Sequence, residues 1–205
     1  MSRYAFFGGS FNPPTKAHMN LAEQVIKEFH IDKFFFVPVG NFFPKQGLLE
    51  EKIRYEMLQI ACREREKMQV SSIELNRKQN LKAIDIFREI KNKYPLDQIY
   101  YVMGADNFEN MINWKESKEL IENYQFILLN RMGKSITKTI EKWPTLQKNQ
   151  SHFHILSSSC ISSISSTEVR EDIKQENWEK VKDKVIPSVV NYIYEKKLYQ
   201  NRQEG

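Results

Sequence analysis

Residues 4–18 read Tyr4-Ala5-Phe6-Phe7-Gly8-Gly9-Ser10-Phe11-Asn12-Pro13-Pro14-Thr15-Lys16-Ala17-His18, and this segment is the most informative part of the chain. Its first four residues are apolar enough for a buried strand. The two glycines let the backbone turn sharply and approach a ligand closely, and the two prolines keep the loop out of a helix. A helix begins near Thr15. We therefore predict a strand, a glycine turn and a helix N-terminus in immediate succession.

A helix that begins near Thr15 brings His18 one turn later onto the same face. Helix N-termini present free N–H groups and the positive end of a dipole to anions, and Lys16 adds a positive charge there. This combination indicates a phosphate-binding site. The alternative is an ordinary strand-to-helix turn, with Thr15 as the N-cap and His18 on the surface.

Strand and helix patterns alternate along the chain, which implies a parallel sheet covered on both faces, the doubly wound α/β class. The predicted strands are Tyr4–Phe7, Lys33–Val39, Met68–Ile73, Asp97–Met103, Tyr124–Asn130 and Phe153–Leu156. The predicted helices between them are His18–Phe29, Glu51–Arg65 and Lys82–Lys93.

Three short polar or glycine segments follow predicted strands: Gly8-Gly9, Gly40-Asn41 and Gly104-Ala105-Asp106. In a parallel sheet, ligands bind beyond the carboxyl ends of the strands, and all three segments belong to that edge. We therefore expect them to contribute to one site.

A second motif, Ile164-Ser165-Ser166-Thr167-Glu168-Val169-Arg170, stands near the other end of the chain. Ser165 and Glu168 have the spacing of a capping box, so a helix is predicted to begin here. Its N–H groups and hydroxyls can hold a phosphate, and Arg170 can add a bidentate contact. The alternatives are a well-capped helix with a surface arginine, or a flexible linker in the serine-rich stretch 157–167.

The bulk composition indicates a soluble globular protein, with 40% hydrophobic and 28% charged residues among 205. We expect one domain over residues 1–205, with a small helical C-terminal part over about 165–200. Two cysteines, Cys62 and Cys160, make neither a disulfide framework nor a zinc site, and Cys62 is expected in the core.

The net charge of +5 reflects either a generally basic surface or attraction of phosphorylated substrates. No nucleic-acid-binding pattern accompanies it, so a nucleic-acid partner is not expected. The apolar runs are too short to span a bilayer and no signal pattern is present, so we expect a cytoplasmic protein without a membrane partner. The sequence is compatible with an oligomer.

Residues 8–18 resemble the signature of the HxGH nucleotidyltransferases in its T/HxxH form, with Thr15 and His18 in the motif positions and Ala17 where glycine is usual. Residues 164–170 resemble the ISSTxxR element of the same superfamily, which contacts the ATP phosphates from the opposite side. Two such motifs in the right order are hard to obtain by chance.

Within that superfamily the chain is most similar to bacterial nicotinate-mononucleotide adenylyltransferases. Further segments carry this likeness. Residues 40–45 resemble the family's GNPPHK loop, and Arg54 with Met57-Leu58 resembles its HRLxML helix. Gly104-Ala105-Asp106 with Trp114-Lys115 resembles its GAD…W segment, Arg131 matches its arginine after the next strand, and residues 187–199 resemble its closing helix.

The resemblance implies a Rossmann-like enzyme that transfers AMP from ATP to nicotinate mononucleotide with Mg²⁺, giving deamido-NAD and pyrophosphate. It assigns catalytic roles to His18, Thr15 and Lys16. The implied ATP-binding residues are Gly8, Gly9, Ser10, Phe11, His18, Gly104, Asp106, Ser165, Ser166, Thr167 and Arg170. The implied acceptor-binding residues are Asn41, Lys45, Arg77, Trp114 and Arg131. No residue is assigned to a metal held by the protein.

The sequence departs from the family at two places. Pro44 replaces the loop histidine of GNPPHK, and the GPSYT core that helps to hold the pyridine carboxylate is replaced at residues 79–83. Lys78 and Lys82 are either solvated lysines or contacts to an acidic acceptor. Two alternatives therefore stay open: a related adenylyltransferase with a different phosphorylated acceptor, and a non-catalytic nucleotide-binding module.

Overall fold

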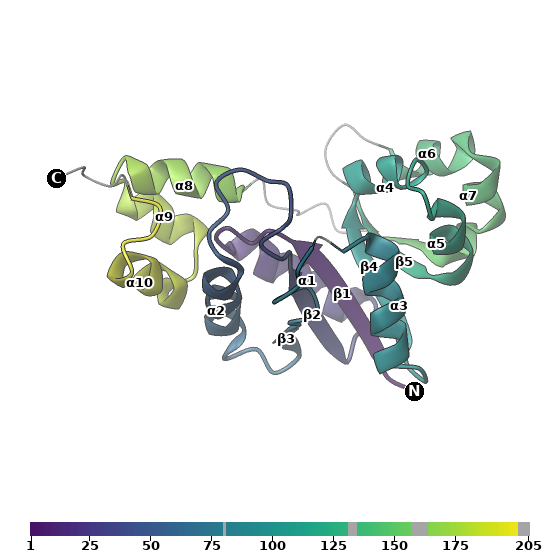
Figure 1. The fold of residues 1–205 in the computed structure, drawn as a ribbon, viewed down its shortest axis with the longest axis horizontal. Coiled ribbons are helices and arrows are strands. Elements are labelled where there is room, and N and C mark those ends of the chain that lie inside the picture. The colour runs from purple at the N-terminus through teal and green to yellow at the C-terminus, as the bar shows by residue number, and fades with distance from the viewer. Residues whose placement is uncertain (80, 131–134, 157–163, 201–205) are drawn as a thin grey trace.

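The sheet has six parallel strands, which confirms the predicted doubly wound α/β class (Figure 1). The structure is a computed structural model that describes residues 1–79, 81–130, 135–156 and 164–200. The strands, in spatial order β3-β2-β1-β4-β5-β6, are β1 Arg3–Gly9, β2 Lys33–Pro38, β3 Met68–Val70, β4 Gln98–Gly104, β5 Gln125–Leu129 and β6 Phe153–Ile155. The strand order reverses between β1 and β4, where sheets of this kind bind ligands.

Helices cover both faces of the sheet and form a separate group at the C-terminal end (Figure 1). Their bounds are α1 Lys16–Glu28, α2 Glu51–Cys62, α3 Ala83–Lys93, α4 Ala105–Met111, α5 Ser117–Asn123, α6 Ile136–Lys142, α7 Pro144–Lys148, α8 Ser166–Lys174, α9 Trp178–Lys184 and α10 Pro187–Glu195, with a 3₁₀ turn over Gln150–His152. Helices α4 to α7 were not predicted, because segments of five to seven residues carry too few turns for a helical period to show. None of the described helices is long and apolar enough to cross a membrane.

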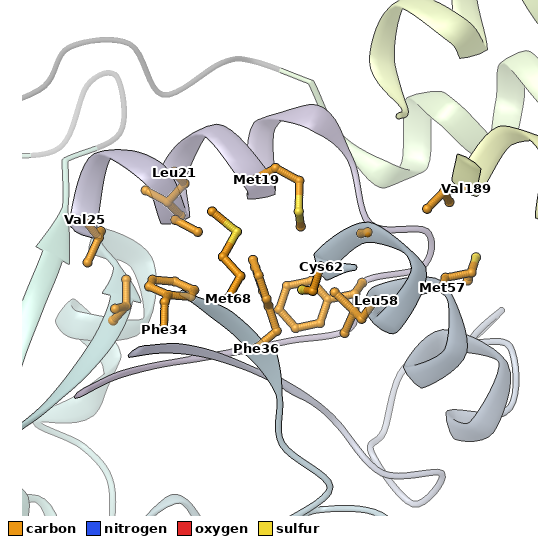
Figure 2. Close-up of a cluster of buried hydrophobic side chains, with 14 of the residues drawn as sticks. Met19, Leu21, Val25, Phe34, Phe36, Met57, Leu58, Cys62, Met68 and Val189 are labelled. Atoms are coloured by element: carbon orange, nitrogen blue, oxygen red, sulfur yellow. The ribbon is translucent and has the colours of Figure 1, made fainter. Parts of the chain in front are cut away.

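Successive side chains of β2 point to opposite faces of the sheet, and each face carries its own hydrophobic core. Phe34 and Phe36 belong to the buried cluster with α1 and α2, while Phe35 and Val37 belong to the cluster with α3. Figure 2 shows the first cluster, in which side chains of α1, α2 and β3 meet the β2 phenylalanines. Cys62 is buried in this cluster, as expected, and burial raises the pKa of its thiol to about 12. A period of two therefore places a continuous apolar strand between two helical layers.

The C-terminal helices share the first of these cores. Val169 and Ile173 of α8 and Val189 and Ile193 of α10 are fully or almost fully buried in the same cluster as Phe36. Val189 lies beside α2 in Figure 2. The segment that carries the second sequence motif is thus packed against the sheet through apolar contacts.

Arg54 on α2 joins the two loops that follow β1 and β2 at the carboxyl edge of the sheet. Its side chain is fully buried, and its three guanidinium nitrogens donate to the carbonyls of Leu49 (2.8 Å), Ser10 (3.0 Å) and Val39 (2.6 Å). Burial lowers the pKa of Arg54, and the nearby carboxylate of Glu51 opposes that shift. The planar guanidinium carries enough donors in fixed directions to satisfy carbonyls from three directions.

We expect Arg54→Met to lower the free energy of unfolding by about 3–5 kcal/mol, because one buried and two partly buried carbonyls would lose their donor. Urea unfolding followed by circular dichroism measures this. Arg63→Met is the matched control, since Arg63 caps the same helix and is exposed, and it should change stability by less than about 0.5 kcal/mol. Equal losses in the two variants would show that the three carbonyls do not depend on Arg54.

Candidate functional site

A cleft of about 760 Å³ opens beyond the carboxyl ends of β1, β2 and β4. Gly8, Gly9 and Ser10 line it, as do Val39 at the end of β2 and Val102 on β4. Other lining residues come from the loop after β2, from one side of α3 and from residues 114–116. The cleft therefore lies at the switch point of the strand order, on the sheet edge where we expected a site. Of the three segments expected there, Gly8-Gly9 lines the cleft, whereas Gly40-Asn41 and residues 104–106 do not.

The two glycines of the first motif have different surroundings. A Cβ at Gly8 would meet no atom within 4 Å, whereas a Cβ at Gly9 would lie 2.9 Å from the ring of Phe11. Phe11 is buried in the core and has a positive φ of 44°. A side chain at Gly9 would collide with the Phe11 ring, so the packing of Phe11 by itself requires glycine at this position. The Phe11 side chain, which the sequence assigned to ATP, packs into the apolar cluster.

His18 and Thr15 form a reciprocal pair at the start of α1. The Nδ1 atom of His18 lies 2.9 Å from the backbone nitrogen of Thr15 and 2.8 Å from its Oγ1. Because a backbone N–H only donates, Nδ1 is the acceptor, and the neutral imidazole carries its hydrogen on Nε2. Thr15 is almost fully buried, and the Phe11 ring packs edge-on at 5.2 Å from the His18 ring. The orientation and tautomer of His18 are therefore set by its neighbours.

Helix α8 binds directly to the first motif. The Ser166 hydroxyl donates to the carbonyl of Pro13 (2.8 Å), and Arg170 donates to the carbonyl of Asn12 (2.8 Å) and to Thr167 Oγ1 (3.2 Å). Ser165 caps α8 by accepting from the backbone N–H of Glu168 (3.1 Å). The structure thus brings the two sequence motifs into one site, and the serine-rich segment ends in a helix. Residues 157–163 lie outside the described residues.

Asn12 is a further residue of this loop, which sequence reasoning did not single out. Its side chain is buried, donates to the carbonyl of Gly47 (2.8 Å), and accepts from the backbone of Leu49 (3.3 Å) and from the Tyr199 hydroxyl (2.8 Å). A buried side-chain amide that makes all these hydrogen bonds fixes the backbone around it. The loop before Thr15 is therefore held from several directions.

The predicted acceptor residues separate into two groups. Lys45, whose ammonium donates to Ser10 Oγ (3.1 Å), and Trp114 both line the cleft. Asn41 instead exchanges two hydrogen bonds of 2.8 Å with Glu51, at the start of α2. Arg77 pairs with Glu89 (2.6 Å) and is not among the cleft-lining residues. Arg131 lies outside the described residues.

Lys16, predicted to be catalytic, and Gly104 and Asp106, predicted to bind ATP, lie away from the cleft. The Lys16 ammonium donates to the carbonyl of Lys182 on α9 (2.8 Å). Gly104 caps α4, and Asp106 lies in the first turn of that helix with an exposed side chain. None of these three lines the cleft.

Further charged residues line the cleft, among them Lys82 and Lys115, which the sequence analysis named, and Glu74 and Glu116, which it did not. Lys82 pairs with Glu116 at 3.0 Å, and Lys115 precedes Glu116 in the chain. Glu74 is buried, and burial raises its pKa to about 7 against the opposing effects of the Gly40 backbone and Arg54. The sequence could have pointed to Glu74 by its position, because it follows β3 at the same sheet edge as the other loops of the site.

We expect Glu74→Gln to stabilise the protein above neutral pH. The folded state holds the Glu74 proton more tightly than the unfolded chain does, so stability falls as pH rises from the ordinary value of 4.5 to about 7 and is level above it. Removing the ionisation should raise the free energy of unfolding by up to about 3 kcal/mol at roughly pH 8 and change it little near pH 4.5.

Urea unfolding at the two pH values measures this difference. Glu179→Gln serves as the control, because the Glu179 side chain is 89% exposed, and its effect should be small at both pH values. If the difference in free energy of unfolding between Glu74→Gln and wild type were the same at both pH values, the raised pKa assigned to Glu74 would be wrong.

Residues 6–172 match the model of the protein family described as cytidylyltransferase-like. The chain is 34% identical over 195 residues to a probable nicotinate-nucleotide adenylyltransferase of Acholeplasma laidlawii, covering 95% of this chain and 96% of that protein. It is 31% identical over 206 residues to a protein of the same description from Shouchella clausii, covering both chains completely.

The fold is also found in solved structures. The nicotinic acid mononucleotide adenylyltransferase of Plasmodium falciparum, in complex with NaAD, superposes with a TM-score of 0.81 over 97% of this chain and 98% of that one, at 22% identity. A putative nicotinate-nucleotide adenylyltransferase from Vibrio parahaemolyticus gives a TM-score of 0.66 at 18% identity, over 97% and 96% of the two chains. These likenesses confirm the Rossmann-like fold.

Proposed function

We propose that this chain, which belongs to the cytidylyltransferase-like family and, within it, to the nicotinate-nucleotide adenylyltransferases, transfers AMP from ATP to nicotinate mononucleotide. The products are deamido-NAD and pyrophosphate. The observation that carries the proposal is the binding of α8 to the first motif, where Ser166 and Arg170 donate to the carbonyls of Pro13 and Asn12. The N-termini of α1 and α8, which both suit an anion, then meet at the loop before Thr15, beside the cleft.

The reaction is an in-line attack by a phosphate oxygen of the acceptor on the α-phosphorus of ATP, in which the bond to pyrophosphate breaks. A phosphomonoester has its second pKa near 6, so the attacking oxygen is already ionised at neutral pH. No protein base is needed. The residues of the site have to align two anions and stabilise the negative charge that develops on the leaving oxygen.

In this proposal His18 donates its Nε2–H to the phosphate at which that charge develops. Thr15 positions the His18 ring, since its backbone N–H and its hydroxyl both contact Nδ1 of that ring. Ser165, Ser166, Thr167 and Arg170 serve the β- and γ-phosphates at the start of α8. Lys16 reaches the phosphates only by leaving the Lys182 carbonyl, a change that a flexible lysine side chain makes easily.

Mg²⁺ enters as part of the substrate, bound to the ATP phosphates. Among the residues that the structure describes, no group of three or more His, Cys, Asp and Glu side chains could hold a metal ion. The polar side chains of the two motifs are hydroxyls, a histidine and an arginine, a set that suits a nucleotide polyphosphate. The metal would neutralise phosphate charge during the transfer.

The cleft suits the acceptor. It combines aromatic and apolar lining residues with Lys45, Lys82 and Lys115, so it offers a wall for a planar ring and cations for acidic groups. Lys45 lies against Ser10, next to the glycines of the first motif. An acceptor phosphate beside Lys45 would therefore be near the place where the ATP phosphates bind.

The test is pyrophosphate release from ATP and Mg²⁺ with a panel of phosphorylated acceptors. We expect the highest specificity constant with nicotinate mononucleotide, ahead of nicotinamide mononucleotide, because a site that pairs a substrate carboxylate discriminates against an analogue without it. Activity with another phosphorylated acceptor alone would show a related adenylyltransferase. ATP binding without pyrophosphate release from any acceptor would show a binding module.

His18→Ala should reduce turnover by about 10²–10³-fold, because it removes a preoriented donor to developing charge. The Michaelis constant for ATP should change much less. His30→Asn is the matched control, because His30 is exposed beyond the end of the same helix and its positive φ of 52° suits asparagine. Melting curves check that both variants fold, and near-normal turnover of a folded His18→Ala would remove His18 from the mechanism.

A further inference from the structure

Two consecutive phenylalanines, Phe42 and Phe43, stand in the loop that follows β2. Both side chains are partly exposed, Phe42 to 57% and Phe43 to 37%. Phe43 lines the cleft and Phe42 does not. Among the aromatic rings that the structure describes, neither has a ring partner. Phe43 therefore presents unused aromatic surface to the space that we assign to the acceptor.

The backbone around Phe43 is anchored. Its N–H donates to the carbonyl of Gly40 (3.2 Å), and its own carbonyl accepts from the N–H of Lys45 (2.8 Å). One end of the loop is tied to α2 through the paired hydrogen bonds of Asn41 and Glu51. The Phe43 ring is thus attached to a backbone held at both sides, which lowers the entropy lost when a ligand orders it.

The neighbouring groups give the cleft a direction. Lys45, two residues after Phe43, contacts Ser10, so the cleft that Phe43 lines also has a cation beside the glycine turn. Trp114 supplies a second aromatic side chain to the same cleft from a distant part of the chain. A molecule with its phosphate near Lys45 would therefore place a ring attached to that phosphate toward the aromatic residues.

We propose that Phe43 is a binding residue for the heteroaromatic ring of the acceptor mononucleotide, and that it contributes to the affinity for the acceptor but not for ATP. The inference rests on the proposed function and adds the part of the substrate that this side chain recognises. Stacking of a base on an aromatic side chain is worth about 1–3 kcal/mol, and a planar pyridine offers the same kind of surface.

Phe43→Ala should raise the Michaelis constant for nicotinate mononucleotide about ten- to hundredfold, while turnover and the Michaelis constant for ATP stay within about twofold of wild type. Phe43→Tyr should restore the wild-type value, and Phe43→Leu should restore it only in part, because leucine keeps apolar contact but no ring face. Phe42→Ala is the matched control and should leave all three constants unchanged. Melting curves verify that the variants fold.

Calorimetric titration of wild type and variants with nicotinate mononucleotide, without ATP, gives the same comparison independently of turnover. Wild-type affinity in Phe43→Ala, or an equal loss in Phe42→Ala, overturns the inference while an active wild-type enzyme leaves the proposed function standing. A wild-type protein that releases no pyrophosphate yet binds the mononucleotide through Phe43 refutes the proposed function alone. A wild-type protein that neither binds it nor turns it over refutes both.

Discussion

The carboxyl edge of this sheet depends on one buried cation. Arg54 donates to three carbonyls in two loops: Ser10 in the loop after β1, and Val39 and Leu49 at the two ends of the loop after β2. Each of these loops borders the cleft or the first motif. A guanidinium can serve three carbonyls at once because its donors lie in one plane at fixed angles, whereas a lysine ammonium is a compact point charge on a flexible stem. Through Arg54 the core of α2 determines where the functional loops lie.

A second set of contacts fixes the same loop from the C-terminal side. Tyr199 donates to the Asn12 side chain, and Arg170 donates to the Asn12 carbonyl. Tyr199 is partly buried, and burial raises its pKa against the opposing charges of Arg170 and Arg54, so its hydroxyl stays protonated and able to donate. The C-terminal helices are therefore part of the site's framework, and their apolar residues in the shared core hold that framework to the sheet.

The proposed site uses the two faces of the sheet differently. The Thr15–His18 pair and α8 belong to the face covered by α1 and α2, whereas the cleft is lined by α3 and the residues before α5. The two halves meet at Gly8 and Gly9 in β1, the strand at which the sheet order reverses. An arrangement of this kind lets two anionic substrates approach from opposite faces of the sheet. Their charges are then close together only at the reacting phosphates, which limits the electrostatic repulsion between them.

The strands, the main helices and the two motifs could be predicted from the amino-acid sequence, because strand alternation, helical period, glycine turns and capping residues are local patterns. The sequence by itself did not determine which side chains face the cleft. Phe11 packs into the core, Arg77 pairs with Glu89, and Glu74 becomes a buried carboxyl of raised pKa. These outcomes arise from contacts between residues distant in the chain, and from desolvation, neither of which a local pattern records. Only the tertiary structure decided them.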